Sequence, residues 1–255
     1  MRVCVVIPSL NDSAMLAGCL AALAKQTRAA DAVIVVDNGS TDDTAEVARA
    51  AGARVVPEPL RGIFPATAAG FDAALADGAD LIARLDADSV PPADWLARIV
   101  GEFEADGDLA ALSGAGEFYG SNAVIHWIAE NVYIGGYIWF VGWLLGTDPL
   151  FGSNLALKAS AWSRVRTTVH RRMREIHDDL DLTIHFEPDM ITRFDRTLRV
   201  GVSARPFESF SGFLRRIDWA FSTLGLNWRE RSLFDRRAER RAWHKRGDQL
   251  DQARA

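Results

Sequence analysis

Short apolar runs alternate with segments of helical periodicity along the first 105 residues. Val3–Ile7 is a continuous, mostly β-branched run, as expected of a strand buried on both faces of a parallel sheet. Ser13–Ala24 follows with leucines three and four positions apart, which places them on one helical face. The alternation continues with strands predicted over Ala32–Val36, Arg54–Val56 and Ala79–Leu85, and with helices predicted from Thr41 or Asp42 to Ala51, over Pro65–Ala76 and over Pro92–Ala105. This order predicts right-handed crossovers and a doubly wound, mostly parallel α/β sheet.

The pattern changes after a fifth predicted strand, Ala110–Gly114. The following segment, Ala123–Gly146, is rich in Trp, Tyr and Ile but is interrupted by His126, Glu130 and Asn131. About fifteen uninterrupted residues remain, which is too short for a membrane span of ~20 residues. The segment therefore predicts either a packed core or lid, or an apolar, aromatic surface that meets a membrane interface.

The C-terminal part contains a predicted strand, Arg199–Ala204, and a predicted amphipathic helix, Phe210–Trp228. The run Arg229–Arg246 carries an excess of basic residues, which is typical of a solvated helix face and would also suit contact with anionic lipid. We therefore expect an α/β half at residues 1–118, a mainly helical half of the same domain at 119–228 and a basic tail at 229–255.

Charge and cysteine content narrow the class of protein. The formal net charge is −5 and the isoelectric point is about 5.6, so no overall field attracts nucleic acid. Cys4 and Cys19 lie in apolar patterns and form neither a disulfide framework nor a metal-binding spacing. Because Pro8 ends the first apolar run too early for a signal peptide, we expect a cytoplasmic protein, with contact at the inner face of the membrane as an option.

Carboxylates follow the predicted strands where ligands bind in such sheets, at the carboxyl ends of the strands. Asp86 and Asp88 come directly after the strand that ends at Leu85. Two such carboxylates suit Mg²⁺ or Mn²⁺ together with phosphate oxygens, although aspartates also cap helices and form turns. Asp37 ends the second strand before an Asn-Gly turn, where it either binds a base or ribose or only helps to reverse the chain.

Six segments in this order make the chain resemble the family 2 glycosyltransferases, which have the GT-A fold. They are Val6–Asp12, Val36–Asp42, Gly62–Gly70, Asp86–Asp88, Gly152–Asn154 and Asp178–Leu182, and the likeness extends to about residue 205. The resemblance implies transfer of a sugar from a nucleotide-diphosphate sugar to an acceptor hydroxyl, with Mg²⁺ or Mn²⁺ and with inversion. It also implies a role in cell-envelope, polysaccharide or glycolipid synthesis, with a glycan, a lipid-linked molecule or a small molecule as acceptor.

The resemblance also implies a role for each matching residue. Those expected to hold the donor are Pro8, Ser9, Asn11, Asp37, Asn38, Gly39, Arg61, Gly62, Arg84, Asp86, Ala87 and Asp88. Asp88 would be the main metal ligand, Asp86 would contact metal or ribose, and His177 is a weaker metal candidate. An acceptor hydroxyl needs a base to take its proton, and Asp179, or its neighbour Asp178, occupies that position. Acids at this place would also be favourable simply as the start of a helix.

Two departures from the family pattern affect the expected donor contacts. Leu10 stands where many relatives have an aromatic residue, so stacking on the base would have to come from elsewhere. Thr67-Ala68 replaces the usual Arg-Asn, which removes a diphosphate contact that Arg61 or Arg84 would have to supply.

Other classes of protein remain as alternatives. A catalytically degenerate, sugar-nucleotide-binding or scaffold relative would tolerate the change at Thr67-Ala68. A Rossmann oxidoreductase or methyltransferase needs a glycine-rich turn after the first strand, where this chain has Pro8-Ser9-Leu10-Asn11 and no G-x-G-x-x-G. The sequence makes no prediction of oligomeric state.

Overall fold

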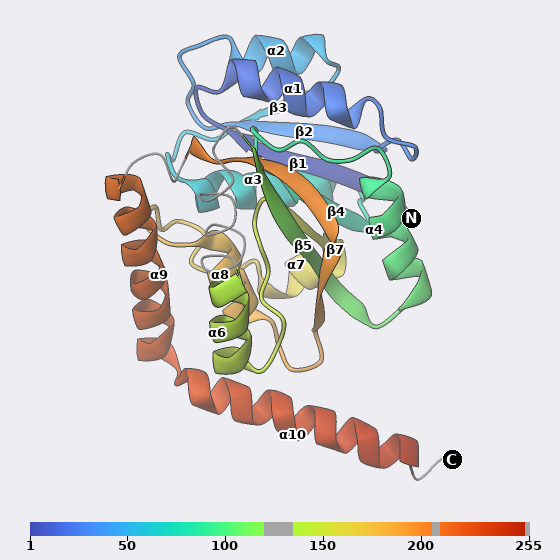
Figure 1. Cartoon of the computed structure of the whole chain (residues 1–255), viewed down its shortest axis with the longest axis vertical. Coiled ribbons are helices and arrows are strands. Elements are labelled where there is room, and N and C mark those ends of the chain that lie inside the picture. The colour runs from blue at the N-terminus through green and yellow to red at the C-terminus, as the bar shows by residue number, and fades with distance from the viewer. Residues whose placement is uncertain (120–134, 206–209, 253–255) are drawn as a thin grey trace.

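A seven-stranded sheet organises the protein, whose computed structural model describes residues 1–119, 135–205 and 210–252 (Figure 1). The strand order is β3-β2-β1-β4-β6-β5-β7. The strands are β1 (Val3–Ser9), β2 (Ala32–Asp37), β3 (Arg54–Pro57), β4 (Leu81–Leu85), β5 (Leu109–Tyr119), β6 (Asn154–Lys158) and β7 (Ile191–Ser203). Strand β6 runs antiparallel to both β4 and β5, whereas the other neighbouring pairs are parallel. The predicted mostly parallel α/β fold is confirmed.

Helices cover both faces of the sheet. On one face lie α1 (Ser13–Leu23), α2 (Thr44–Ala50) and α4 (Trp95–Ala105), and on the other lie α3 (Ile63–Ala76) and α7 (Ala159–Val165). Val5 of β1 packs into the core under α1 and α4, whereas its neighbours Cys4 and Val6 pack into the core under α3 and α7. Successive side chains of a strand point to opposite faces, so burial on both sides explains why β1 is apolar from Val3 to Pro8.

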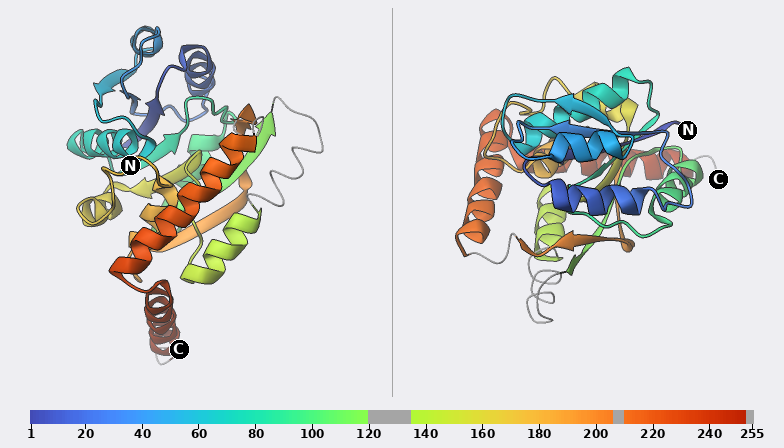
Figure 2. Two further views of the ribbon diagram at one scale, coloured as in Figure 1. Left: turned by 90° about the vertical axis from the view of Figure 1, so that its left-hand side faces the viewer. Right: turned by 90° about the horizontal axis from the view of Figure 1, so that it is seen from above.

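Four helices beyond the sheet build the C-terminal part: α6 (Gly135–Leu145), α8 (Asp178–His185), α9 (Phe210–Glu230) and α10 (Leu233–Gln252) (Figure 2). Val141, Leu180 and Leu233 belong to a small core shared by α6, α8 and α10. The first part of the predicted aromatic segment, with His126, Glu130 and Asn131, lies outside the described residues. No helix within the described ranges is both long and apolar enough to cross a membrane.

The basic C-terminal run includes a buried cation. The guanidinium of Arg240 on α10 donates hydrogen bonds to the carbonyl oxygens of Leu145, Thr183 and Phe186, at 3.0, 3.0 and 2.7 Å. These carbonyls lie at the ends of α6 and α8, where helices leave acceptors without partners. Arg240 therefore joins three helices, a role that the charge pattern alone did not indicate.

The end of the sheet at β7 differs most from the sequence-based prediction. Only Arg199–Ala204 was predicted as a strand, but β7 begins at Ile191, and β6 was not predicted at all. The first half of β7 carries charged side chains that pair outside the sheet: Arg193 bonds to Glu102 and Asp106. Because β7 is an edge strand, half of its positions need no apolar partner, and its hydrophobic pattern is weak.

A polar cluster fixes α9 to α8. Asp181, on α8, is fully buried and accepts hydrogen bonds from Nδ1 of His170 at 2.7 Å and from Asn227 at 2.7 Å. His170 also contacts Glu230 through Nε2 at 2.9 Å. An imidazolium between two carboxylates is favourable, and its bond to Asp181 is the main reason that the pKa of His170 is raised to about 9.

We predict that this cluster makes stability depend on pH. The folded pKa of His170 lies above the ordinary 6.5, so its contribution is complete below pH 6.5 and is lost as the pH rises through about 9. Urea unfolding measures how much larger the free energy of unfolding is for the wild type than for His170→Gln. We expect this difference to be about 2 kcal/mol larger at pH 6 than at pH 9.5. A difference that does not change with pH would contradict the ion pairing.

Helix α3 approaches the sheet closely through a glycine. A Cβ atom on Gly70 would lie 2.3 Å from Cγ1 of Val6 and 2.8 Å from Cγ2 of Val36, both inside van der Waals contact. The missing side chain therefore lets α3 pack directly on β1 and β2, and Gly62 at its start is held against the same strands. This contact places the first turn of α3 beside the ends of both strands.

Adding one methyl group at this position should destabilise the fold. We expect Gly70→Ala to lower the free energy of unfolding by about 1 to 3 kcal/mol, because the core must move to admit it. Gly18→Ala is the matched control, since Gly18 lies in α1 and a Cβ atom there would meet open space. This variant should have a free energy of unfolding about 0.5 to 1 kcal/mol higher than the wild type, because alanine favours the helix more than glycine does. Chemical denaturation of both variants checks the prediction. Equal changes in the free energy of unfolding for the two variants would contradict it.

Candidate active site

The ends of β1 and β4 and the start of β6 meet at one edge of the sheet. Strand β4 lies between β1 and β6, and Leu85, its last residue, is paired with Asn154 of β6. Asp86 and Asp88 follow directly and therefore face Pro8 and Ser9, at the end of β1, across a common crevice. This is the edge at which open α/β sheets bind ligands.

The two aspartates after β4 have different partners. Asp86 accepts hydrogen bonds from Ser153 Oγ at 2.5 Å and from Nη2 of Arg84 at 2.9 Å. Asp88 has one longer contact, 3.3 Å to Nη2 of Arg205. Burial, reinforced by the charge of Asp86, raises the pKa of Asp88 to about 6. A cation would relieve this repulsion, so the two carboxylates suit a divalent metal ion.

Arg84 links the two acidic segments of the site. Its guanidinium is buried and lies between Asp86, at 2.9 Å, and Asp178, at 3.3 Å. Gly152 leaves room for it, because a Cβ there would lie 2.0 Å from Nη1. Arg84 is thus occupied by protein carboxylates rather than turned toward a diphosphate, and it holds the end of β4 against the start of α8.

The acidic pair at the start of α8 divides into a buried and an accessible member. Asp178 is buried, accepts a hydrogen bond from Thr67 Oγ1 at 2.8 Å, and has a pKa raised by burial against the opposing charge of Arg84. Asp179 lies at the cavity, where its two oxygens accept the backbone N–H groups of Gly152 and Leu180 at 2.9 and 2.8 Å. Both carboxylates line the cavity, and Asp179 is the less buried of the two, with 13% of its side chain exposed against 9% for Asp178.

The imidazole of His177 also faces this cavity. Its Nε2 lies 2.9 Å from the carbonyl oxygen of Arg216, so this nitrogen carries the proton and donates. Nδ1 lies 4.0 Å from Asp179 Oδ1. A histidine that donates one ring N–H to a backbone carbonyl and turns the other nitrogen to a cavity is oriented as metal ligands are.

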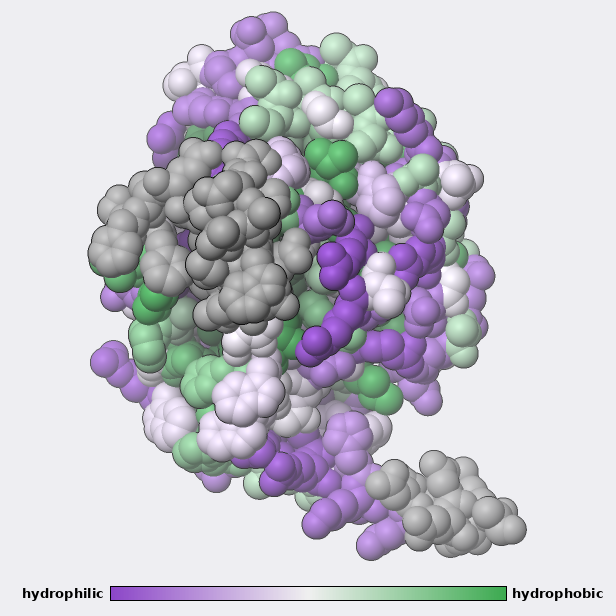
Figure 3. Space-filling model, in the orientation of Figure 1, coloured by the Kyte–Doolittle hydropathy of each residue, from purple (hydrophilic) through white to green (hydrophobic). Residues whose placement is uncertain are grey.

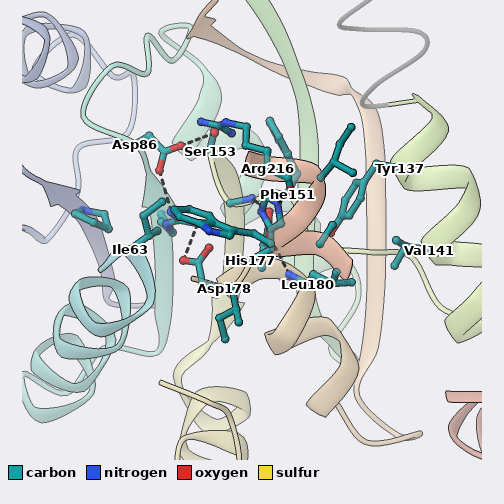
Figure 4. A pocket seen from close by; sticks show the side chains of 18 of the residues that line it. Ile63, Asp86, Tyr137, Val141, Phe151, Ser153, His177, Asp178, Leu180 and Arg216 are labelled. Carbon is teal, nitrogen blue, oxygen red and sulfur yellow. Dashed lines mark hydrogen bonds and ion pairs between the residues drawn. The ribbon is translucent and has the colours of Figure 1, made fainter. Parts of the chain in front are cut away.

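These groups line a cavity of 510 Å³ between the sheet edge and helices α6, α8 and α9 (Figure 4). Asp86, Ser153, Asp178 and His177 are drawn on its polar side, and Tyr137 and Val141 of α6 close the opposite side. Two regions of different chemistry, one acidic and one apolar, are therefore in contact within a single site.

A second cavity, of 400 Å³, adjoins the first and shares Pro8, Ser9 and Leu10 with it. Its other side includes Asn38, Arg61 and Gly62, which the sequence analysis also selected. Asn38 is buried and holds the loop in place, since its Nδ2 donates to the carbonyls of Glu58 and Leu60 and its Oδ1 accepts from Gly62 N. Trp219 lines both cavities beside Leu10, so the aromatic surface that position 10 lacks is provided by α9.

Three of the selected residues do not line either cavity. Asp37 accepts the backbone N–H of Ser40 at 2.9 Å, and Asn11 accepts that of Thr41 at 2.7 Å. Gly39 has a φ of 83°, and its carbonyl accepts a hydrogen bond from Arg61 at 2.9 Å. These residues shape the loops after β1 and β2, whereas Ala87, Asp86, Asp88, Asp178 and Asp179 come together at the first cavity.

Several residues at the site were not selected from the sequence. Arg205 follows β7 and joins Asp12, at 2.8 Å, to Asp88, at 3.3 Å. Ser153 belongs to a motif that was recognised, but its bond to Asp86 was not foreseen. For Arg205 a signal existed, because it follows the last predicted strand and so reaches the same edge as the aspartates.

A second group of metal-ligating side chains, His170, Asp181 and His185, lies away from both cavities. His185 is buried and donates from Nδ1 to the carbonyl of Asp181 at 2.8 Å. This group therefore belongs to the packing of α8 and α9 rather than to the site.

Curated relatives match this chain over part of their length. A protein of Mycobacterium tuberculosis described as an uncharacterized glycosyltransferase is 43% identical over 107 residues, which cover 42% of this chain and 46% of the relative. A protein of the same species described as a PGL/p-HBAD biosynthesis glycosyltransferase is 36% identical over 109 residues, or 39% and 42% of the two chains. The match thus spans less than half the length of these relatives.

Solved glycosyltransferase structures share the fold. Glucosyl-3-phosphoglycerate synthase from M. tuberculosis, in complex with Mn²⁺, UDP-glucose and phosphoglyceric acid, superposes with a TM-score of 0.62 at 20% identity, over 89% of this chain and 79% of that one. TarS from S. aureus gives 0.63 at 13% identity, over 90% and 39%. These likenesses identify the sheet and its helices as a GT-A fold.

The sequence itself matches a family model described as Glycosyl transferase family 2, over residues 4–159. That range is more than half of the chain and contains both strand-end aspartates of the first cavity, Asp86 and Asp88. The match to this family model also excludes the oxidoreductase and methyltransferase alternatives. By its sequence, its fold and the acidic edge of its sheet, the chain belongs to glycosyl transferase family 2.

Proposed function

We propose that this protein transfers a sugar from a nucleotide-diphosphate sugar to an acceptor hydroxyl, with a divalent metal ion and with inversion at the anomeric carbon. The observation that carries the proposal is the convergence of Asp86, Asp88 and Asp179 on one cavity from segments about 90 residues apart in the sequence. A nucleoside pocket, a metal site and a base are the three parts that such a reaction needs, and each has candidate residues here.

Asp86 and Asp88 would hold Mg²⁺ or Mn²⁺, with Nδ1 of His177 as a further ligand. Hard carboxylate oxygens and the repulsion that raises the pKa of Asp88 fit such an ion. The metal, when bound, offsets the charge of the diphosphate as it leaves. Structures of the similar glucosyl-3-phosphoglycerate synthase contain Mn²⁺ with UDP-glucose, which makes this pair the first donor and metal to test.

The nucleoside would occupy the second cavity. Pro8, Ser9 and Asn38 line it, and Trp219 offers an aromatic face for the base. Arg61 and Arg174 line the same cavity and are the cations available near a diphosphate, since Arg84 is bound to Asp86 and Asp178. The bound donor would then extend from this cavity toward Asp86 and Asp88.

Asp179 would be the general base. Two backbone N–H groups fix its carboxylate at the cavity, so it can accept the proton of an acceptor hydroxyl placed within hydrogen-bond reach. Asp178 is buried between Thr67 and Arg84 and would position the pair instead. A single base that assists direct displacement at the anomeric carbon inverts its configuration. The relatives described as PGL/p-HBAD biosynthesis glycosyltransferases support a role in glycolipid or other cell-envelope synthesis.

The metal site predicts that nucleotide binding depends on Asp88. Isothermal titration should show that UDP binds with Mn²⁺ and binds much more weakly without it. Asp88→Asn should weaken the metal-dependent binding by roughly 100-fold or more, because loss of even an outer partner of a metal ligand costs 10- to 100-fold. Asp108→Asn, an exposed turn residue, is the control and should bind like the wild type. The assignment would be contradicted if the affinity for UDP were the same with and without Mn²⁺, and the same in the wild type and in Asp88→Asn.

The assignment of the base predicts a different result for Asp179. Asp179→Asn should lower the metal-dependent turnover of UDP-glucose by about 10²- to 10⁴-fold, the usual effect of losing a general base, while UDP and Mn²⁺ still bind. Product analysis measures the turnover and titration measures the binding. If the wild type binds UDP and Mn²⁺ but turns over none of a panel of nucleotide sugars, the catalytically degenerate alternative is favoured.

A further inference from the structure

The side of the 510 Å³ cavity opposite the aspartates is apolar. Tyr137 and Val141 of α6 face it from one side, and Ala220 and Leu224 of α9 face it from another. Phe151 lies between this surface and the catalytic carboxylates (Figure 4). An acceptor whose hydroxyl reaches Asp179 therefore has the rest of its structure against hydrocarbon and aromatic side chains.

This apolar wall continues to the protein surface. Phe140 and Phe221 both line the cavity, yet their side chains are 44% and 70% exposed. Trp139 and Trp143 extend the same surface along α6 and are 70% and 48% exposed. Pale and green side chains gather on the lower part of the face drawn in Figure 3. The cavity thus has an apolar exit, along which a chain longer than the cavity can leave.

The charges of the cavity disfavour an anionic acceptor. Its lining carboxylates are Asp12, Asp86, Asp88, Asp178 and Asp179, and its cationic or titratable nitrogen groups are Arg84, Arg216 and His177. Arg84 is already neutralised by Asp86 and Asp178, and His177 is bound to the carbonyl of Arg216. With one metal ion serving the donor diphosphate, the guanidinium of Arg216 is the cation of the lining that remains for a second anion, and five carboxylates line the same cavity. The surroundings therefore repel an anionic acceptor more than they attract it.

We propose that the acceptor is a neutral alcohol or sugar that carries an alkyl or aryl group, with its hydroxyl at Asp179 and the apolar group between α6 and α9. This inference rests on the proposed function, and it specifies the acceptor class that the function leaves open. Burial of the apolar group against Val141, Ala220 and Leu224 supplies binding free energy in proportion to the area removed from water.

A homologous series of acceptors tests the inference. Methyl, butyl, hexyl and octyl β-glucosides, below their micelle concentrations, are titrated into the protein loaded with UDP and Mn²⁺. Affinity should rise about fourfold for each methylene that becomes buried, which is ~0.8 kcal/mol for each CH₂. 3-Phosphoglycerate, the anionic comparison, should not bind. Equal affinity along the series, or binding of 3-phosphoglycerate in its place, would overturn the inference.

Two variants on one helix locate the binding surface. Ala220→Glu places a carboxylate in the cavity and should remove the chain-length dependence, whereas Ser222→Glu, on the exposed side of α9, should retain it. Circular dichroism establishes that both variants are folded. Chain-length dependence that survives in Ala220→Glu would place the alkyl group elsewhere and overturn the inference.

Titration with UDP and Mn²⁺ keeps this inference separate from the proposed function. If the wild type fails to bind UDP and Mn²⁺, the proposed function fails, and the acceptor inference fails with it. If UDP and Mn²⁺ bind but the four glucosides have the same affinity as one another, the acceptor inference alone fails.

Discussion

The buried guanidinium of Arg84 is the interaction on which the rest of the site depends. It lies between Asp86, at the end of β4, and Asp178, at the start of α8, and so joins segments that are distant in the sequence. A buried charge is tolerated only with partners, and removing one partner leaves the others uncompensated. Asp88 and Asp179 each lie within two residues of this bridge, so it sets the spacing between the proposed metal site and the proposed base.

Much of the fold follows from burial on both faces of the sheet. The strands β1, β2 and β4 have neighbours on each side and helices above and below, so they are mostly apolar and were predicted within two residues. Their polar residues, Ser9, Asp37 and Arg84, lie at or next to the carboxyl ends of the strands. Strand β6 is short and begins with Asn154, whose amide satisfies buried carbonyls of Ala115 and Leu198. Its polar start serves a tertiary contact, which local periodicity does not encode.

The site was predictable to the extent that it depends on strand ends. Asp86 and Asp88 follow a parallel strand, and parallel strands bring their carboxyl ends to one edge whatever the rest of the chain does. The helix α9 is different, because its place depends on packing against α8. Trp219 therefore had no signal in the motifs, and the bond from Thr67 to Asp178 crosses 111 residues.

Thr67 and Arg84 also constrain how this sequence can change. Both contact the same oxygen of Asp178, one with a neutral hydroxyl and the other with a cation. An arginine at position 67 while Arg84 remains would bring a second guanidinium to the same oxygen, in a buried space that now holds only a threonine side chain. The two positions are thus coupled through the oxygen they share, so the effect of a substitution at one depends on the residue at the other.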